Sequence, residues 1–123
     1  MRIALTLLLV LASAPAWAQW VKVGQTYAAV HYVDPATVSK DGNLRRVWAL
    51  QDMVDAGASG VMSIRALQEY DCAQDRFRYL SVTTHSRPMA GGYVLAEHEL
   101  RDAWNARPSG RNPTAIGKIV CAP

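Results

Sequence analysis

The sequence predicts an α+β domain, in which a short C-terminal helix is packed on one face of an antiparallel sheet. Two observations carry this expectation. Most of the chain consists of short segments rich in β-branched and aromatic residues, separated by turn residues. Helical spacing of apolar residues appears near the C-terminus, just before Cys121, and Cys72 lies in the middle of the chain. A bond between the two cysteines would tether the helix to the sheet.

Residues 1–18 have the order of a secretory signal peptide. Arg2 provides a positive start, residues 3–12 are almost entirely apolar, and Ala16 and Ala18 form an Ala-x-Ala cleavage pattern. The apolar run is shorter than the ~20 residues that cross a bilayer. A retained anchor or a buried helix are the alternatives. We expect cleavage after Ala18, which leaves residues 19–123 as one exported domain with no transmembrane segment.

Composition sets further bounds on this domain. Half of the residues of the full 123-residue chain are hydrophobic and 19% are charged, as in ordinary globular proteins. Removal of Arg2 lowers the number of Lys and Arg residues from 13 to 12, against 10 Asp and Glu, and the net charge becomes +2. This charge is too small to indicate nucleic acid as a partner.

The two cysteines predict a disulfide. An even number of cysteines in an exported chain favours pairing, and Cys72 and Cys121 allow one pair. The alternative, a site in which both thiols bind a metal, lacks the Cys-x-x-Cys spacing of zinc sites. A disulfide here would close a loop of ~50 residues and stabilise the domain by roughly 4 kcal/mol.

The first half of the domain is expected to contain three strands, at residues 20–23, 27–33 and 45–55. Asp34-Pro35 resembles a helix cap followed by a first-turn proline, so one helical turn is predicted over residues 35–38. Asp41-Gly42-Asn43 predicts a tight turn, because Gly and Asn tolerate positive φ. Residues 56–60 are small and predict a loop.

The second half is expected to begin with a hairpin of residues 61–72 and 76–85. Apolar residues alternate along its first strand and place Cys72 on the apolar face, whereas Ser63, Arg65 and Glu69 lie on the other face. A last strand is predicted over residues 93–97, after Gly91-Gly92. Trp104 is expected to be a buried anchor, and Asn112-Pro113 to begin a helix over 113–121.

The residues predict no catalytic, cofactor or metal site. His31, His85 and His98 form no ligand motif, and no nucleophile elbow is present. One candidate for binding is an anion patch on the 76–85 hairpin and its continuation, formed by Arg76, Arg78 and Arg87. The alternative is that these arginines form cross-strand ion pairs, since Asp71 and Asp75 lie beside them.

An ordered set of short motifs extends over residues 20–121. They are Trp20, Tyr32-Val33-Asp34, Asp41-Gly42, Val47-Trp48-x-Leu50-x-Asp52, Glu69-Tyr70-Asp71-Cys72, Met89-x-x-Gly92, Trp104 and Val120-Cys121. In this order the motifs resemble the bacterial surface-adhesin protein E family. The resemblance implies an antiparallel sheet of about six strands and a C-terminal helix tethered by a disulfide, and Cys72 and Cys121 are the positions that match residues with a firm family role.

The resemblance also implies a function. It favours a non-catalytic, adhesin-like, protein-binding module of the cell envelope, with host extracellular or outer-membrane proteins as partners. The family's adhesins are lipid-anchored, whereas this chain has no cysteine at the expected cleavage site. We therefore expect a periplasmic or secreted protein and leave surface display open. The sequence specifies neither the partner nor the oligomeric state.

Two other functions stay open at this point. One is a periplasmic protein that binds a small molecule or peptide in a groove between sheet and helix, near Trp48 or Trp104. The other is a small periplasmic hydrolase that uses His85 or His98.

Overall fold

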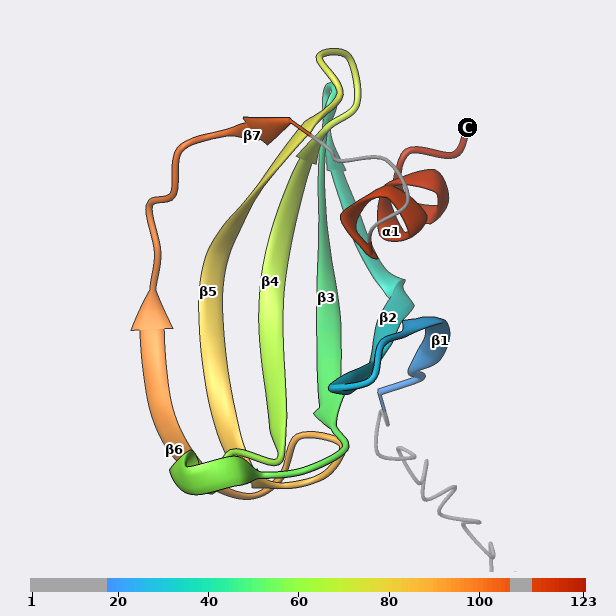
Figure 1. Cartoon of the computed structure of the whole chain (residues 1–123). Helices are drawn as coiled ribbons and strands as arrows, with labels where there is room; N and C mark the ends of the chain where they lie inside the picture. Colours follow the sequence, from blue (N-terminus) through green and yellow to red (C-terminus); the bar gives the residue numbers. More distant parts are fainter. Residues whose placement is uncertain (1–17, 107–111) are drawn as a thin grey trace, which may run out of the picture.

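The computed structural model describes residues 18–106 and 112–123 (Figure 1). The predicted signal peptide lies almost entirely outside these residues, so its removal stays a prediction. Among the residues described, no helix has the length and hydropathy that a membrane span requires. The elements are β1 (Val21–Gln25), β2 (Ala29–Asp41), β3 (Leu44–Met53), the short 3-10 helix η1 (Gly57–Ser59), β4 (Ser63–Asp71), β5 (Arg76–Arg87), β6 (Gly91–Glu99), β7 (Asn105–Ala106) and α1 (Asn112–Val120).

The strands form one antiparallel sheet in which chain order and spatial order coincide. The sheet runs β1-β2-β3-β4-β5-β6, and the short β7 pairs with β5 (Figure 1). The predicted antiparallel sheet is confirmed. The α+β class was wrong, because α1 has nine residues while the seven strands account for most of the described chain, so the fold is mostly β.

The hydrophobic core lies on one face of the sheet, here called the core face. Paired residues on neighbouring antiparallel strands point to the same face, and the pairs Val33↔Ala49 and Tyr70↔Phe77 both belong to this core. Two residues of α1 join the same buried cluster. Its members are Val33, Val47, Ala49, Tyr70, Phe77, Ile116 and Val120.

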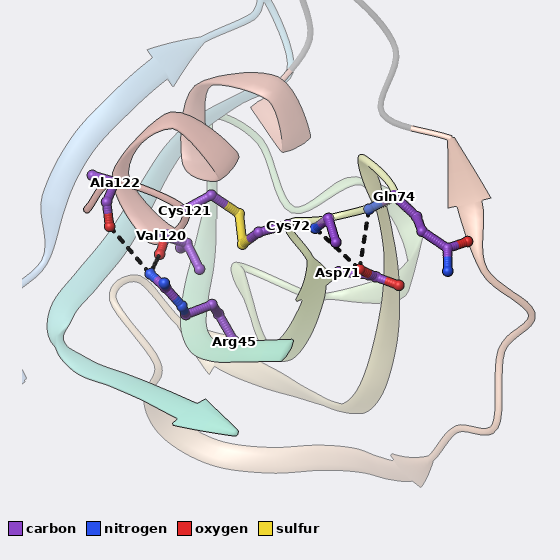
Figure 2. Close-up of a disulfide and its surroundings, with 8 residues drawn as sticks. Arg45, Asp71, Cys72, Gln74, Val120, Cys121 and Ala122 are labelled. Atoms are coloured by element: carbon purple, nitrogen blue, oxygen red, sulfur yellow. Dashed lines mark hydrogen bonds between the residues drawn. A yellow bond between two sulfur atoms is a disulfide. The ribbon is translucent and has the colours of Figure 1, made fainter. Parts of the chain in front are cut away.

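The predicted disulfide is confirmed. Cys72 follows β4 and Cys121 follows α1, and their Cα atoms are 5.6 Å apart (Figure 2). Two hydrogen bonds support the same junction: Nη1 of Arg45 in β3 donates to the carbonyl oxygens of Val120 at 2.9 Å and Ala122 at 3.1 Å. A covalent bond and a charged side chain thus hold the end of α1 beside the sheet.

The helical turn predicted over residues 35–38 was wrong, because β2 continues through it. The Asp34-Pro35 pattern nevertheless coincides with an irregularity in the strand, since the pairing of β2 with β3 is interrupted between Asp34 and Ser39. Pro35 lies in this interruption, where its missing N–H breaks no ladder bond. The hydroxyl of Thr37 donates to the carbonyl oxygen of Asp34 at 2.7 Å and accepts the Trp48 N–H at 3.0 Å.

The face of β4 that was predicted to be polar is buried over much of its length. Ser63 is fully buried, Glu69 is 1% exposed and Asp71 is 5% exposed. Alternation correctly assigned Ser63 and Glu69 to the face opposite Tyr70, but it did not show that other side chains cover them. This second face therefore contains organised polar groups, and we call it the charged face.

Candidate functional site

The charged face contains an ion-pair cluster that spans three strands. The backbone register aligns Arg46 of β3, Glu69 of β4 and Arg78 of β5 in one row. Glu69 accepts from Nε of Arg46 at 2.8 Å and from Nη2 of Arg78 at 2.7 Å. In the next row, Nε of Arg76 lies 3.0 Å from Asp71. Alternating charges across the strands thus neutralise two buried carboxylates.

The arginines determine how these carboxylates titrate. Burial raises the pKa of Glu69, but the hydrogen bonds and positive charges of Arg46 and Arg78 outweigh burial and hold the pKa below its ordinary value. Burial also raises the pKa of Asp71, but backbone N–H groups at Gln74 and Ala73 and the Arg76 guanidinium together lower it. Both groups are therefore ionised at neutral pH.

Trp104 covers this cluster on its outer side. Its ring lies 4.2 Å from the guanidinium carbon of Arg78 and 4.7 Å from that of Arg76. Trp104, which was predicted to be a buried anchor, is half-buried. It packs on two cations, which are favourable partners for an indole face.

The predicted anion patch of Arg76, Arg78 and Arg87 is not gathered in one place. Arg76 and Arg78 neighbour each other on the charged face, but both are paired with carboxylates. Arg87 lies at the other end of the 12-residue strand β5. The geometry agrees with the alternative interpretation, in which Arg76 and Arg78 form cross-strand ion pairs.

A cavity of about 310 Å³ lies farther along the charged face, and we call it the trough. It is bordered by β3, β4, β5 and β6. Its lining residues are Trp48, Arg65, Ser81, Val82, Thr83, Glu97, His98 and Glu99.

The register explains why this part of the sheet is hollow. One row contains Arg65, Thr83 and Glu97 on β4, β5 and β6, and the adjoining row contains Ser81 and Glu99 on β5 and β6. The side chains on β5 are short hydroxyls, whereas those on its neighbours are long. The side chains of Ser81 and Thr83 therefore form a low floor between two higher walls.

Arg65 is held against Trp48 in one wall of the trough. Its guanidinium carbon lies 3.6 Å from the centre of the indole ring. Burial lowers the pKa of Arg65 and the nearby charge of Asp34 raises it, but arginine remains a cation at neutral pH. Arg65 takes part in none of the ion pairs found in residues 18–106 and 112–123.

His85 lies on the same face of β5 as Thr83, one row further along the strand, and is 7% exposed. Its Nε2 is 2.9 Å from the hydroxyl of Thr83, while its Nδ1 is buried without a hydrogen-bond partner among the described residues. Burial lowers the pKa of His85, Arg65 lowers it further and Glu97 raises it. A neutral His85 can donate from Nε2 to Thr83, which leaves the Thr83 hydroxyl proton free for the trough.

A second, smaller cavity of about 70 Å³ opens toward the core face. Ile116 of α1 and Tyr79 of β5 are among its lining residues, together with His31. This is where the predicted groove between sheet and helix would lie, but Trp48 and Trp104 are not part of it. Trp48 borders the trough on the opposite face instead.

The two histidines considered for hydrolysis, His85 and His98, do not share a site. The register pairs His85 with Ser63 of β4. The Ser63 hydroxyl is buried, donates to the Arg87 carbonyl oxygen at 2.6 Å and accepts the Ala90 N–H at 2.9 Å. His98 is exposed, and the register places it on the face opposite His85.

The outer edge of β6 is the most apolar exposed part of the described sheet. β6 is the last strand of the sheet order, so β5 is its strand neighbour on one side and its other side is open. Tyr93 is 82% exposed, Val94 52% and Leu95 48%. Sequence reasoning placed a strand here but did not identify an edge, because strand order is a property of the tertiary fold.

The trough was also missed at the sequence level. A signal was present in two i, i+2 pairs on consecutive strands, Ser81 with Thr83 and Glu97 with Glu99. Interpreting them required the register between β5 and β6, which contains an irregularity near Thr84 and His85.

Comparisons with known proteins agree with this architecture. The structure of protein E from non-typeable Haemophilus influenzae matches with a TM-score of 0.61 and 11% identity, over 89% of this chain and 79% of that chain. Crystal form II of Haemophilus influenzae protein E matches with a TM-score of 0.56 and 11% identity, over 82% of this chain and 95% of that one. At this identity, the likeness shows a shared fold.

No curated protein matches the sequence. The sequence profile of the family described as surface-adhesin protein E matches residues 20–122, which is nearly the whole predicted mature domain. This chain therefore belongs to the surface-adhesin protein E family.

Proposed function

We propose that this protein is an adhesin-like, non-catalytic binding module of the cell envelope. Family membership supports the adhesin-like role, and host extracellular or outer-membrane proteins are the proposed partners. The observation that supports binding at β6 is its open, apolar edge, where Tyr93, Val94 and Leu95 are exposed.

An edge strand offers two kinds of contact at once. Its unpaired backbone N–H and C=O groups can accept an extended peptide as a further strand, and its side chains select among such peptides. β6 has nine residues, whereas the strand at the other edge, β1, has five. We therefore assign partner binding to β6.

The proposal includes the form in which the protein acts. Residues 1–18 are removed as a signal peptide, and residues 19–123 act as one exported, disulfide-bonded domain. Within it, α1 covers the core face, which the burial of Ile116 and Val120 in the core cluster supports. Cell fractionation combined with protease treatment of intact cells tests whether the domain is periplasmic, released or displayed on the surface.

Binding to a panel of immobilised extracellular-matrix proteins and to solubilised outer-membrane proteins tests the role of β6. A double variant, Tyr93→Lys with Leu95→Lys, should weaken binding at least tenfold by adding charge to the edge. Tyr27→Lys is the matched control, because Tyr27 is 97% exposed and lies outside the strands. Absence of binding by the wild-type domain, or equal losses in both variants, contradicts the proposal.

A further inference from the structure

The trough has features of a small-ligand site that the β6 edge lacks. It is a concave space of about 310 Å³, within the range of many ligand pockets. Hydroxyl groups of Ser81 and Thr83 point to the same face of the sheet from a strand between the two walls. The floor therefore provides hydrogen-bonding groups without filling the space.

The two walls have opposite charge. Arg65 lies on the β4 side, and Glu97 and Glu99 lie on the β6 side. Antiparallel strands are ~4.8 Å apart, so the backbones of the two walls are separated by about 10 Å. None of the ion pairs in the described parts of the chain includes Arg65, Glu97 or Glu99. Asp34 acts on Arg65 through its charge but forms no ion pair with it, and the two carboxylate oxygens of Asp34 accept backbone N–H groups from Gln19 and Ala36.

We propose that the trough binds a small zwitterion that carries an ammonium group and a carboxylate, as a free amino acid or a short peptide with free ends does. The carboxylate binds Arg65, and the ammonium group binds Glu97 and Glu99. The hydroxyls of Ser81 and Thr83 hydrogen-bond to the polar atoms between the two charged ends. This site is distinct from the proposed function of the β6 edge and does not depend on it.

Charge and geometry disfavour other small ligands. A simple anion such as phosphate would pair with Arg65 alone, and a simple cation would pair with Glu97 and Glu99 alone, so each would leave the opposite wall without a partner. A neutral sugar would leave the charges of both walls without compensation. It would also find one face of Trp48 covered by the Arg65 guanidinium.

Backbone NMR of the oxidised domain, titrated with the dipeptide Ala-Ala at millimolar concentration, tests the proposal. Amide signals of residues around Arg65, Thr83 and Glu97 should shift. N-acetyl-Ala-Ala, Ala-Ala amide and glucose serve as probes that lack the amine, the carboxylate or both. Each should bind at least tenfold more weakly than Ala-Ala, which is the effect of losing one charge-assisted contact.

Variants identify which wall holds which end of the ligand. Glu97→Gln should weaken Ala-Ala binding and reduce the penalty of N-acetylation, whereas Arg65→Gln should weaken binding and reduce the penalty of amidation. Arg101→Gln, at an exposed position outside the trough, is the control. Because Arg65 packs on Trp48, each variant is first checked for a native NMR spectrum, and Glu97→Gln at the exposed wall provides an independent test.

The outcomes separate this proposal from that of the β6 edge. Loss of protein binding in the Tyr93→Lys, Leu95→Lys variant with retained Ala-Ala binding supports two independent sites. No shift with Ala-Ala, equal binding of the capped peptides, or preferential binding of glucose overturns the zwitterion proposal, whatever the β6 experiment shows.

Discussion

Arg45 and Val120 join the sheet to the end of α1: the Arg45 guanidinium donates to the Val120 carbonyl oxygen at 2.9 Å, across 75 residues of sequence. The last carbonyl groups of a helix have no partners within the helix, and a cation is favourable at that end. Ala122 provides a second acceptor at 3.1 Å. Arg45 therefore satisfies the end of α1 as well as attaching it.

Arg45→Met should lower the free energy of unfolding by about 1–3 kcal/mol. The reason is that the hydrogen bonds from the charged side chain to the helix end are lost while the apolar stem is retained. Urea denaturation of the oxidised protein measures this change. Arg101→Met, at an exposed site, should change stability by less than about 0.5 kcal/mol. Equal stability of the two variants would show that Arg45 does not support α1.

Replacement of both cysteines by serine should cost about 4 kcal/mol. The Cys72–Cys121 bond links residues 49 positions apart, and its removal restores conformational freedom to the unfolded chain. Denaturation of the double variant and of reduced wild-type protein should give similar midpoints, both well below that of oxidised protein. A double variant as stable as the oxidised protein would contradict this prediction.

Glu69→Gln should destabilise the fold by about 1–3 kcal/mol, since Glu69 is 1% exposed and pairs with both Arg46 and Arg78. The neutral amide keeps the shape of the side chain but loses the negative charge and replaces one acceptor oxygen with a donor. Glu99→Gln is the matched control, because Glu99 is exposed and belongs to none of the ion pairs in the described residues. A comparison of unfolding midpoints at low and at high salt should show that the Glu69 effect persists in salt.

Stability should decrease as the pH falls below about 6.5, the ordinary pKa of histidine. Burial lowers the pKa of His31, and burial with Arg65 lowers that of His85 against the opposing effect of Glu97. The unfolded chain therefore takes up protons at a higher pH than the folded chain does. The two histidines contribute fully to stability above their pKa in the unfolded chain. This contribution is lost as the pH falls from that value to their lower pKa in the folded chain.

Each of these histidines should reduce stability by up to about 1.4 kcal/mol per pH unit within that window. Unfolding midpoints at about pH 7.5 and about pH 5.5, one unit above and one unit below the ordinary histidine pKa, measure how stability changes with pH. His31→Gln and His85→Gln should each flatten this dependence. A slope that is the same in both variants and in the wild-type protein would refute this assignment.

Local patterns predicted local structure well. Alternation along residues 61–72 gave β4 and the face of Tyr70, and Asp41-Gly42-Asn43 gave the turn between β2 and β3, where Gly42 has φ 58°. The helix over 113–121 was confirmed to within one residue at each end. The family profile, the antiparallel sheet and the disulfide agree with what the motifs implied.

Features that depend on contacts between strands were harder to predict. Pro35 produced a local helix signal, although the surrounding strand tolerates it at a break in pairing. Arg76 and Arg78 could be assigned to a common face, but their pairing with Asp71 and Glu69 depends on register. The trough requires both the register and the different lengths of side chains on β4, β5 and β6, which no single segment reveals.

The coincidence of strand order with chain order has a consequence for how the protein forms. Each strand from β2 to β6 pairs with the strand that precedes it, so the sheet can grow by successive hairpins that close short loops. The contacts of α1 with β1, β2 and β3 instead join the two ends of the domain. We therefore expect the sheet to assemble early and α1 to dock late, with oxidation of Cys72 and Cys121 as the step that makes this last contact durable.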